Sequence, residues 1–492
     1  MNYVEFEQYC AEFNFVPVYE MISADFLTPV LAYLKIRKEN TASFLLESVE
    51  GIGRLARYSF IGIDPAEIIS NEGTKLTVRS NNCEIKIEEN LFDYLKKKIS
   101  CFNYPTIEAL PYFTGGITGF IGFENVSLIE EVLKFEKNND SNIQDSILGF
   151  FKTIVAFDHL KRQIILITNV DVTEKEDLPQ KYSSAKIILQ NLRYQLSKEI
   201  RYKSDFKIDF QKLNHNDEDA FLSLVEKCKI NIHNGDVIQI VLSKRFEGDF
   251  KGDSFNIFRA LRTINPSPYM YYMEFENDLK IIGTSPEDLL KVNGRKAEIL
   301  PIAGTRRRGK TKEEDLKLEK ELLNDPKEIA EHTMLVDLAR NDLGRVCKYG
   351  SICLSEKMKI NRFSHVMHIV SRVEGILNDK SDCIDALKAA FPAGTVTGAP
   401  KIRAIELIKE YEKMNRSVYA GAVGYIDFRG NLDMCIAIRT FFSMGSKIFW
   451  QAGAGIVADS VPELEYKEIL NKSAVLINAL KNAEVIDENS FY

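Results

Sequence analysis

The chain has 492 residues, which exceeds the usual size of one domain and predicts two domains or one elaborated domain. Its 45% hydrophobic and 27% charged residues are ordinary for a globular protein, and 64 basic against 71 acidic side chains give a net charge of −7. This balance argues against a general nucleic-acid or membrane-surface binder, and no apolar run reaches the roughly 20 residues needed to span a bilayer.

The eight cysteines are scattered without a CxxC pair, which argues against a zinc site or a disulfide framework. This cysteine usage favours a reduced, cytoplasmic setting. The first residues mix glutamates with aromatic side chains and do not read as a signal peptide.

The first part of the chain, to about residue 195, reads as mixed strands and helices. Strands are predicted over 43–48, 57–63, 154–157 and 163–168, the last two as a pair. Four glycines in 113–123 predict a bent strand pair in which backbones approach closely, and 173–199 reads as a surface helix. Residues 200–218 are polar and weakly periodic, which predicts a linker or crossover between a domain over 1–200 and another over 216–485.

The second part begins with a predicted helix over 219–234, which Gly235 ends, and a buried strand over 237–242. Further helices are predicted over 327–346 and after Ser460. Strands and helices alternate without a regular β-α-β rhythm, and glycine-linked strand pairs are common. This pattern favours an α+β fold with large, mostly antiparallel sheets over a doubly wound fold.

Residues 300–309 read Leu-Pro-Ile-Ala-Gly-Thr-Arg-Arg-Arg-Gly. Such a segment can present backbone N–H groups and guanidinium forks to a carboxylate. A solvated basic turn is an equally good interpretation of its composition.

Two acidic segments offer hard oxygen ligands. Glu331 lies off the apolar stripe of the helix over 327–346, where an exposed charged surface with pairs such as Asp337–Arg340 is the plainer interpretation. Ser460 and Glu463 have the spacing of a capping box, with Glu465 and Glu468 following at i, i+3. These carboxylates indicate either a solvated acidic first turn or ligands of Mg²⁺.

Two glycine-containing segments could approach an anion. In 452–455 small residues alternate, which indicates either a strand bend or a backbone surface that a ligand approaches. In 391–401 a Gly/Thr loop feeds a helix that starts near Lys401, which is typical of anion binding, although the P-loop spacing fails. His365 and His368 are compatible with metal binding, acid/base chemistry or a buried structural role.

Taken together, these segments resemble the chorismate-utilising enzymes and, within that family, the anthranilate synthase large components (component I). The resemblance runs over nearly the whole chain. It is carried by residues 235–243, 265–270, 285–287, 301–305, 331–342, 365–368, 394–401, 419–425, 438–439 and 451–455.

Two positions distinguish this chain from other members of the family. Gln239 stands where isochorismate and salicylate synthases carry a lysine that activates water, so the resemblance disfavours water addition. Ala303 stands where many aminodeoxychorismate synthases carry a lysine. Arg307 replaces a proline that is usual in the family.

The resemblance implies a role for each site residue. Glu331 and Glu468 would bind Mg²⁺, which grips the ring carboxylate of chorismate. Glu287 would be the acid that protonates the departing C4 hydroxyl as ammonia enters at C2, with a pKa raised by burial or by a neighbouring carboxylate. His368 and Thr395 would assist the later loss of pyruvate. The substrate oxygens would be bound by Gly304, Thr305, Tyr419, Arg439, Gly453, Ala454 and Gly455.

The resemblance also implies regulation and a partner. Ser48, Pro268, Tyr269 and Met270 would contact tryptophan as a feedback inhibitor, in the segment over 1–200 and the adjoining strand. No segment resembles a glutamine amidotransferase, so the chain would use ammonia directly and glutamine only with a separate glutaminase subunit, in a heterotetramer of two such pairs. The alternatives are aminodeoxychorismate synthase component I and a catalytically silent, tryptophan-sensing regulatory subunit.

Overall fold

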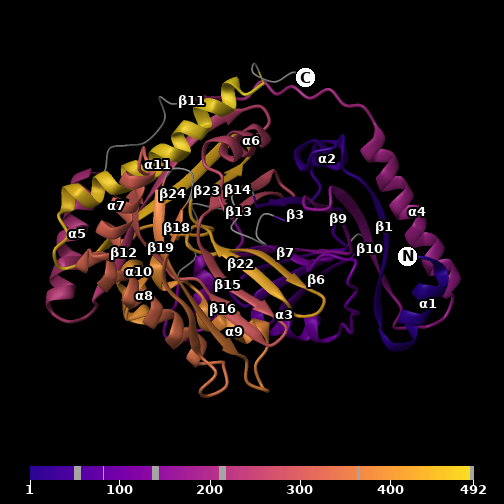
Figure 1. Ribbon diagram of the computed structural model, residues 1–492, viewed down its shortest axis with the longest axis horizontal. Coiled ribbons are helices and arrows are strands. Elements are labelled where there is room, and N and C mark those ends of the chain that lie inside the picture. The colour runs from indigo at the N-terminus through magenta and orange to yellow at the C-terminus, as the bar shows by residue number, and fades with distance from the viewer. Residues whose placement is uncertain (49–56, 81–82, 136–142, 210–217, 363–365, 488–492) are drawn as a thin grey trace.

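The structure is a computed structural model that describes residues 1–48, 57–80, 83–135, 143–209, 218–362 and 366–487. Within these residues the strands form two sheets of twelve strands each, called sheet A and sheet B, and all paired strands are antiparallel. Figure 1 shows the sheets stacked in the centre of the molecule with helices around them.

The strand order of sheet A is β1 (Phe15–Ser23), β10 (Gln163–Asp171), β9 (Thr153–Asp158), β3 (Tyr58–Ile63), β2 (Ser43–Glu47), β13 (Tyr269–Glu274), β14 (Leu279–Ser285), β23 (Thr440–Met444), β24 (Lys447–Ile456), β12 (Gln239–Lys251) and β11 (Lys207–Asp209), with β20 (Gly398–Ala399) beside β12.

The strand order of sheet B is β17 (Ile302–Arg307), β19 (Val366–Ile376), β16 (Lys296–Ile299), β15 (Asp288–Asn293), β22 (Leu432–Ile436), β21 (Ala422–Asp427), β7 (Gly116–Ile121), β8 (Ser146–Phe151), β4 (Glu67–Glu72), β5 (Lys75–Ser80) and β6 (Cys83–Glu88), with β18 (Cys353–Arg362) beside β19.

The inner faces of the two sheets bury a shared aromatic core. Phe60 of β3 in sheet A lies 6.3 Å, between ring centroids, from Tyr425 of β21 in sheet B. Phe120 of β7 likewise lies 6.0 Å from Phe275, which follows β13. Side chains of both sheets therefore exclude water from one layer, as in a sandwich of two sheets. The predicted α+β fold with large antiparallel sheets is confirmed.

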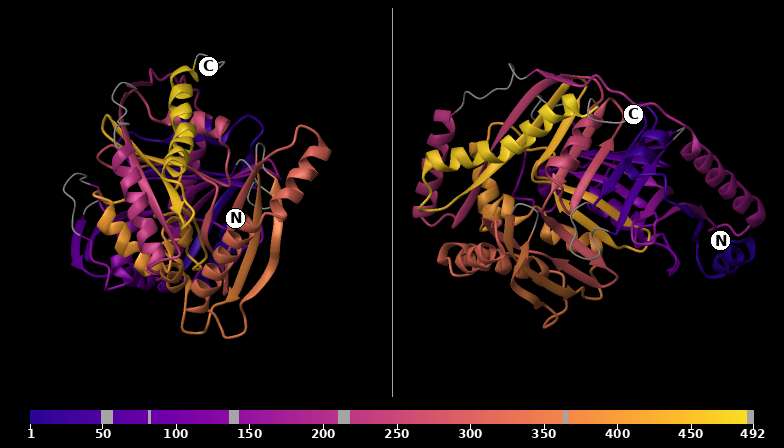
Figure 2. Two further views of the ribbon diagram at one scale, coloured as in Figure 1. Left: turned by 90° about the vertical axis from the view of Figure 1, so that its left-hand side faces the viewer. Right: turned by 45° about the horizontal axis from the view of Figure 1, so that its top comes forward.

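Helices bury the outer face of each sheet. The helices with buried apolar residues in the core of sheet A are α1 (Tyr3–Glu12), α2 (Pro29–Ile36), α4 (Leu178–Ser197), α5 (Glu218–His233), α6 (Phe255–Ile264) and α11 (Pro462–Val485). Those over sheet B are α3 (Leu91–Ser100), α8 (Pro326–Gly344) and α9 (Cys383–Ala390), while α10 (Lys401–Tyr411) contributes to both cores and α7 (Lys312–Leu323) packs on β17 and β19. Figure 2 shows α11, in yellow, lying across the strands of sheet A.

Strands from both parts of the chain lie side by side in both sheets. In sheet A, β2 pairs with β13, and in sheet B, β7 pairs with β21. The division into units over 1–200 and 216–485 stays a prediction. None of the described helices is long and apolar enough to cross a membrane.

The predicted helices begin and end for local reasons. Asp325 caps α8 by accepting from the backbone N–H groups of Lys327 and Glu328, and Pro326 occupies the first turn. Gly235 follows α5 with φ of +83°, a left-handed conformation that glycine adopts without strain. The predicted end of that helix at Gly235 is confirmed.

The prediction of a bent strand pair over 113–123 is wrong. These residues form one strand, β7, followed by the 3-10 helix η2 (Phe123–Leu128). The glycines are needed because β7 lies between β8 and β21. A Cβ atom on Gly119 would lie 2.1 Å from the carbonyl oxygen of Ile147, and one on Gly116 would lie 2.1 Å from that of Ile426.

The predicted capping box of the last helix is also wrong. The helix α11 begins at Pro462 after Val461, and no side chain caps its first turn. The Ser460 hydroxyl instead accepts from the backbone N–H of Val457 at 3.0 Å, which fixes the turn after β24. Pro462 does occupy the first turn, as predicted.

Two predicted segments are longer or more ordered than expected. The strand predicted over 237–242 extends as β12 to Lys251, because β24 continues to pair with its polar half. The predicted linker over 200–218 contains β11, the edge strand of sheet A, while 210–217 lie outside the described residues.

Candidate active site

A cavity of about 690 Å³ opens where β24, β12, α8 and α11 meet. It brings together eight of the sequence-predicted site residues, which come from positions 287 to 468 along the chain. These are Glu287, Glu331, Thr395, Tyr419, Arg439, Gly453, Gly455 and Glu468.

Glu287 supplies a carboxyl group with a shifted pKa. It lies between β14 and β15, where its backbone carbonyl accepts from the N–H of Ile436. Burial raises the pKa of Glu287 to about 7, and Thr395, Lys472 and Arg439 moderate this rise. The Thr395 hydroxyl lowers the pKa of this carboxyl group. It is buried and has no hydrogen-bond partner within normal distance and angle limits among the described residues. Of the two expected causes, burial rather than a neighbouring carboxylate raises the pKa of Glu287, and its role as the acid stays a prediction.

Arg439 supplies a poorly solvated cation. It has φ of +50°, and Nη1 donates to Oδ1 of Asn265 at 3.4 Å. Burial lowers the pKa of Arg439, and Glu287 is the charge that opposes this shift. A buried guanidinium that has few hydrogen bonds and few opposing charges within the protein favours an anionic ligand.

Tyr419 and the two glycines form the surface beside this cation. A Cβ atom on Gly453 would lie 2.6 Å from the Tyr419 hydroxyl, and one on Gly455 would lie 2.5 Å from Nε2 of Gln239. Only glycine therefore leaves these side chains in place. Ala454, which alternates with the glycines on β24, is buried in the core on the opposite face and is not among the residues that line the cavity.

Glu331 and Glu468 face the cavity from α8 and α11. The surrounding protein raises the pKa of Glu331, and Glu328 and Glu468 add to this rise by repulsion. Within the described residues no group of three or more His, Cys, Asp or Glu side chains is placed to hold a metal. Two carboxylates with substrate oxygens and waters do fit Mg²⁺, which commonly takes one or two protein carboxylates.

His368, Gly304 and Thr305 lie together on the paired strands β19 and β17. Nδ1 of His368 lies 2.9 Å from the carbonyl oxygen of Gly304 and 3.2 Å from the Thr305 hydroxyl. Because a carbonyl oxygen only accepts, Nδ1 carries the proton. Burial lowers the pKa of His368, and the positive charge of Arg439 lowers it further. These three residues are not among those that line the cavity, and His365 lies outside the described residues.

The three consecutive arginines of 300–309 have partners within the protein. Arg306 binds Asp325 at 2.7 Å and Glu328 at 2.9 Å, and Arg308 binds Asp315 at 2.9 Å. Arg307 binds Glu314 at 2.7 Å. These guanidinium groups pair with carboxylates at the starts of α7 and α8, which argues against an external carboxylate site at these side chains. The segment is part of strand β17 rather than a turn, and the Arg307 side chain is 63% exposed, in agreement with a solvated basic segment.

The lysine of the anion site that was expected at the start of α10 also forms an ion pair within the protein. Nζ of Lys401 binds the carboxylate of Asp342 at 2.9 Å, and both side chains are largely buried. Burial raises the pKa of Asp342 although Lys401 opposes it. The loop before α10 contributes Thr395, from the short 3-10 helix η4 (Gly394–Val396), to the cavity instead.

A second, smaller cavity of about 60 Å³ contains all four residues that the resemblance assigns to tryptophan. Ser48 lines it with a buried hydroxyl that has no hydrogen-bond partner in the described structure. The Tyr269 hydroxyl donates to Asp433 at 2.9 Å, and Pro268 and Met270 lie on either side of Tyr269 in sequence. Cavities that take a benzene molecule measure about 150 Å³, so an indole ring would enter only after these side chains move.

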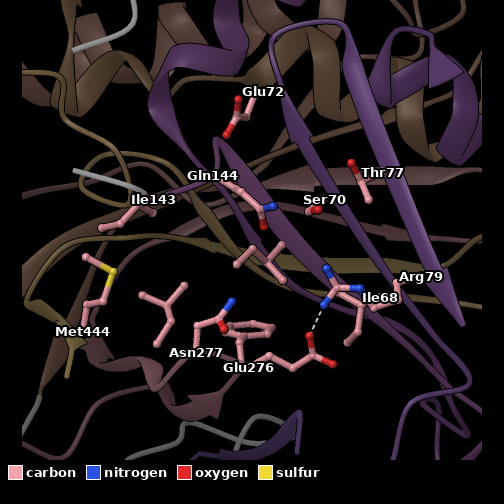
Figure 3. A pocket seen from close by; sticks show the side chains of 13 residues that line it. Ile68, Ser70, Glu72, Thr77, Arg79, Ile143, Gln144, Glu276, Asn277 and Met444 are labelled. Carbon is pink, nitrogen blue, oxygen red and sulfur yellow. Dashed lines mark hydrogen bonds and ion pairs between the residues drawn. The ribbon is translucent and has the colours of Figure 1, made fainter. Parts of the chain in front are cut away.

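A third cavity of about 280 Å³ contains none of the predicted site residues. It lies between strands β4 and β5 and the turn after β13, and Gln144 and Ser70 are among its lining side chains (Figure 3). Arg79 forms an ion pair with Glu276 across it.

The comparison with known families decides the class of protein. The model of the family described as chorismate binding enzyme matches residues 41–478, far more than half of the chain. The chain belongs to this family of chorismate binding enzymes. A curated relative, "Anthranilate synthase component 1" of Aquifex aeolicus, is 43% identical and the alignment covers 97% of each chain.

Solved structures of chorismate binding enzymes share the fold. Anthranilate synthase component I from Streptococcus pneumoniae has a TM-score of 0.74 and 36% identity, covering 93% of this chain and 99% of that one. The menaquinone-specific isochorismate synthase of Escherichia coli has a TM-score of 0.70 at 19% identity, covering 97% and 98%, and supports the fold alone. The resemblance to component I of anthranilate synthase is confirmed.

Two cations that line the cavity, Lys472 and Lys327, were not predicted from the sequence. Lys472 of α11 lines the cavity, where Nζ donates to the carbonyl oxygen of Gly453 at 2.8 Å and binds Glu468 at 2.7 Å. Its positive charge also opposes the rise in the pKa of Glu287 and of Glu331. The signal was present, because Lys472 follows Glu468 by four residues and so shares its helix face.

Proposed function

We propose that the chain is the large component of an anthranilate synthase, which converts chorismate and ammonia to anthranilate and pyruvate with Mg²⁺. The single observation that carries this proposal is the cavity itself. It combines the carboxyl group of Glu287, whose pKa is raised, with the buried guanidinium of Arg439. It also contains the carboxylates of Glu331 and Glu468, which line it from α8 and α11. Relatives named "Anthranilate synthase component 1" support it over nearly the full length of the chain.

Each proposed role follows from what the side chain can do. Arg439 and Tyr419 bind the enolpyruvyl carboxylate, because the guanidinium has few partners within the protein. Glu287 protonates the departing C4 hydroxyl as ammonia enters at C2, since a carboxyl group with a pKa of about 7 is still protonated in a large fraction of molecules near neutral pH. His368 assists the loss of pyruvate, with Thr395 beside Glu287.

Glu331 and Glu468 would hold the magnesium ion. The bound ion supplies positive charge that binds and orients the ring carboxylate of the substrate. Lys472 pairs with Glu468 at 2.7 Å and lines the same cavity, where its charge suits a substrate carboxylate. Gly453 and Gly455, which line the cavity, would contact the remaining substrate oxygens through their backbone groups. The same role for Gly304, Thr305 and Ala454 stays a prediction, because these residues do not line the cavity.

The source of nitrogen distinguishes this chain from a complete glutamine-using enzyme. We propose that it uses free ammonia alone and glutamine only with a glutaminase subunit, in a cytoplasmic heterotetramer of two such pairs. The reaction would be the first committed step of tryptophan biosynthesis. Purified chain should therefore form anthranilate with ammonium, and glutamine should not replace ammonium until the partner subunit is added.

Tryptophan is the proposed feedback inhibitor, and it would bind in the cavity that Ser48, Pro268, Tyr269 and Met270 line. The buried Ser48 hydroxyl without a partner supports this assignment, because a bound amino acid can supply the missing hydrogen bond.

Aminodeoxychorismate synthase is the second candidate, since Ala303 alone does not exclude it. The two reactions differ in their products: anthranilate appears with pyruvate, whereas aminodeoxychorismate keeps its enolpyruvyl group. A coupled assay that measures pyruvate separates them. Consumption of chorismate without pyruvate would favour the second candidate, and no consumption would favour a silent regulatory subunit.

A further inference from the structure

Gln451 lies in the wall of the large cavity, on β24. Its side chain is buried, with 6% of the residue exposed. Nε2 donates to the Ser243 hydroxyl at 2.7 Å, whereas Oε1 has no hydrogen-bond partner among the described residues. A buried acceptor in this state is costly, so a native protein retains it where something else supplies the donor.

The orientation of this amide is fixed by its neighbours. Both the backbone N–H and the hydroxyl of Ser243 donate to Oε1 of Glu412, at 2.8 and 2.7 Å. A carboxylate oxygen only accepts, so the hydroxyl hydrogen of Ser243 is used and its oxygen can only accept from Gln451. The nitrogen of the Gln451 amide must therefore face Ser243, and its carbonyl oxygen must face elsewhere.

Glu412 is itself held in place. Its carboxylate binds the guanidinium of Arg416 at 2.7 Å, and the two side chains are 8% and 1% exposed. Arg416 also donates to the backbone carbonyl oxygens of Val396 and Val241, which lie beside the cavity. A rigid buried network thus presents one unpaired acceptor, which is the requirement for a preorganised binding group.

The charged groups that line the same cavity indicate which ligand this acceptor fits. Arg439, Lys472 and Lys327 line the same cavity, and each is a donor that suits a carboxylate. Chorismate brings two carboxylates for such donors, and the hydroxyl that leaves from C4 needs an acid rather than an acceptor. Ammonia is the substrate that brings N–H donors. Because Glu287, Glu331 and Glu468 of the same lining already have proposed roles, the uncharged Oε1 of Gln451 is a buried acceptor that suits it.

We propose that Oε1 of Gln451 binds the ammonia that reacts with chorismate, with Ser243 and Glu412 as positioning residues. This inference rests on the proposed function and names the nitrogen site within it. The amide oxygen takes no proton, so bound ammonia keeps its lone pair for C2. The C2–N bond forms as the C4–O bond breaks, Glu287 gives a proton to the departing oxygen to form water, and the new ammonium group releases one proton to solvent.

The test replaces Gln451 with Met, which keeps the length of the side chain and removes the acceptor. We expect the KM for ammonium to rise about 10-fold at saturating chorismate, as for the loss of one buried hydrogen bond. The Kd for chorismate, measured by calorimetry without ammonium, should stay within about twofold of the wild type. An unchanged KM for ammonium would overturn the proposal, and so would a raised Kd for chorismate with an unchanged KM for ammonium, because the acceptor would then serve chorismate.

The matched control is Gln144→Met, the same substitution in the third cavity (Figure 3), which should change neither constant. Ser243→Ala keeps the amide but removes its anchor, so the KM for ammonium should rise about threefold even if Gln451→Met fails to fold. An unchanged KM in Ser243→Ala would then overturn the proposal. If the wild type forms no anthranilate, the proposed function fails. If it forms anthranilate and the variants bind ammonium normally, only this inference fails.

Discussion

Asn265 accepts a hydrogen bond from the active-site arginine, Arg439, with 3.4 Å between Oδ1 and Nη1. Asn265 ends α6 and lies three residues before Pro268, which lines the small cavity, while its partner Arg439 lines the large one. Its backbone carbonyl also accepts from the Thr284 hydroxyl at 2.6 Å, and Thr284 lies three residues before Glu287. Asn265 therefore contacts Arg439 itself and the strand that leads to Glu287.

We expect Asn265→Ala to weaken chorismate binding, because Arg439 loses the side chain that orients it. A hydrogen bond to a charged group contributes about 1.5–3 kcal/mol, and the length of this one places it at the lower end, near a tenfold rise in Kd. Calorimetry with chorismate measures this, and Asn256→Ala in the first turn of α6 serves as the control. An unchanged Kd would show that Arg439 is held by its backbone alone.

Glu287→Gln should lower kcat by about 10²–10⁴-fold, because the amide keeps the shape but cannot give a proton. Binding of chorismate, measured by calorimetry, should change much less. A variant that retains the wild-type kcat would remove Glu287 as the acid.

The pH dependence follows from the same group. The pKa of Glu287 is raised to about 7, so its protonated fraction falls as pH rises through that value. At constant concentration of free NH₃, kcat/KM for chorismate should therefore fall above about pH 7. The correction for NH₃ is essential, since its concentration rises with pH. A profile that stays level from pH 6 to pH 9 would contradict the assignment.

Glu331→Ala should abolish turnover that depends on Mg²⁺ while the protein still folds and binds tryptophan. The reason is the loss of one of two carboxylates for the ion. Asp337→Ala is the matched control, because Asp337 is an exposed carboxylate of the same helix whose pairing with Arg340 is weak at 3.4 Å. Unchanged turnover in Glu331→Ala would remove it as a magnesium ligand.

Ser48→Phe should weaken inhibition by tryptophan and spare the activity measured without tryptophan. The phenyl ring would fill a cavity of about 60 Å³ that is separate from the large one. Inhibition curves for the variant and the wild type measure the change. If the two curves coincide, Ser48 does not belong to the effector site.

Local patterns were sufficient for the class of fold and for most strands, since alternation and turn residues act over a few positions. They failed where a distant partner decides the outcome. The glycines of β7 are required because the backbones of β8 and β21 leave no room for a Cβ atom, and Arg306 binds carboxylates about 20 residues later. Neither relationship leaves a trace in the local periodicity.

The site shows the same division. The resemblance named eight residues that meet in one cavity, but it gave no reason to single out the side chain of Gln451. The orientation of the Gln451 amide is set only in the folded chain, where β12 pairs with β24. Ser243, 208 positions away in sequence, then accepts its hydrogen bond. Hydrogen-bond direction is a property of the folded network, and sequence spacing does not contain it.

The most direct measurement incubates the purified chain with chorismate, Mg²⁺ and ammonium, and follows the fluorescence of anthranilate with and without tryptophan. We expect the fluorescence to rise, the rise to require Mg²⁺, and tryptophan to suppress it. Chorismate that is consumed without anthranilate and without pyruvate would contradict the account.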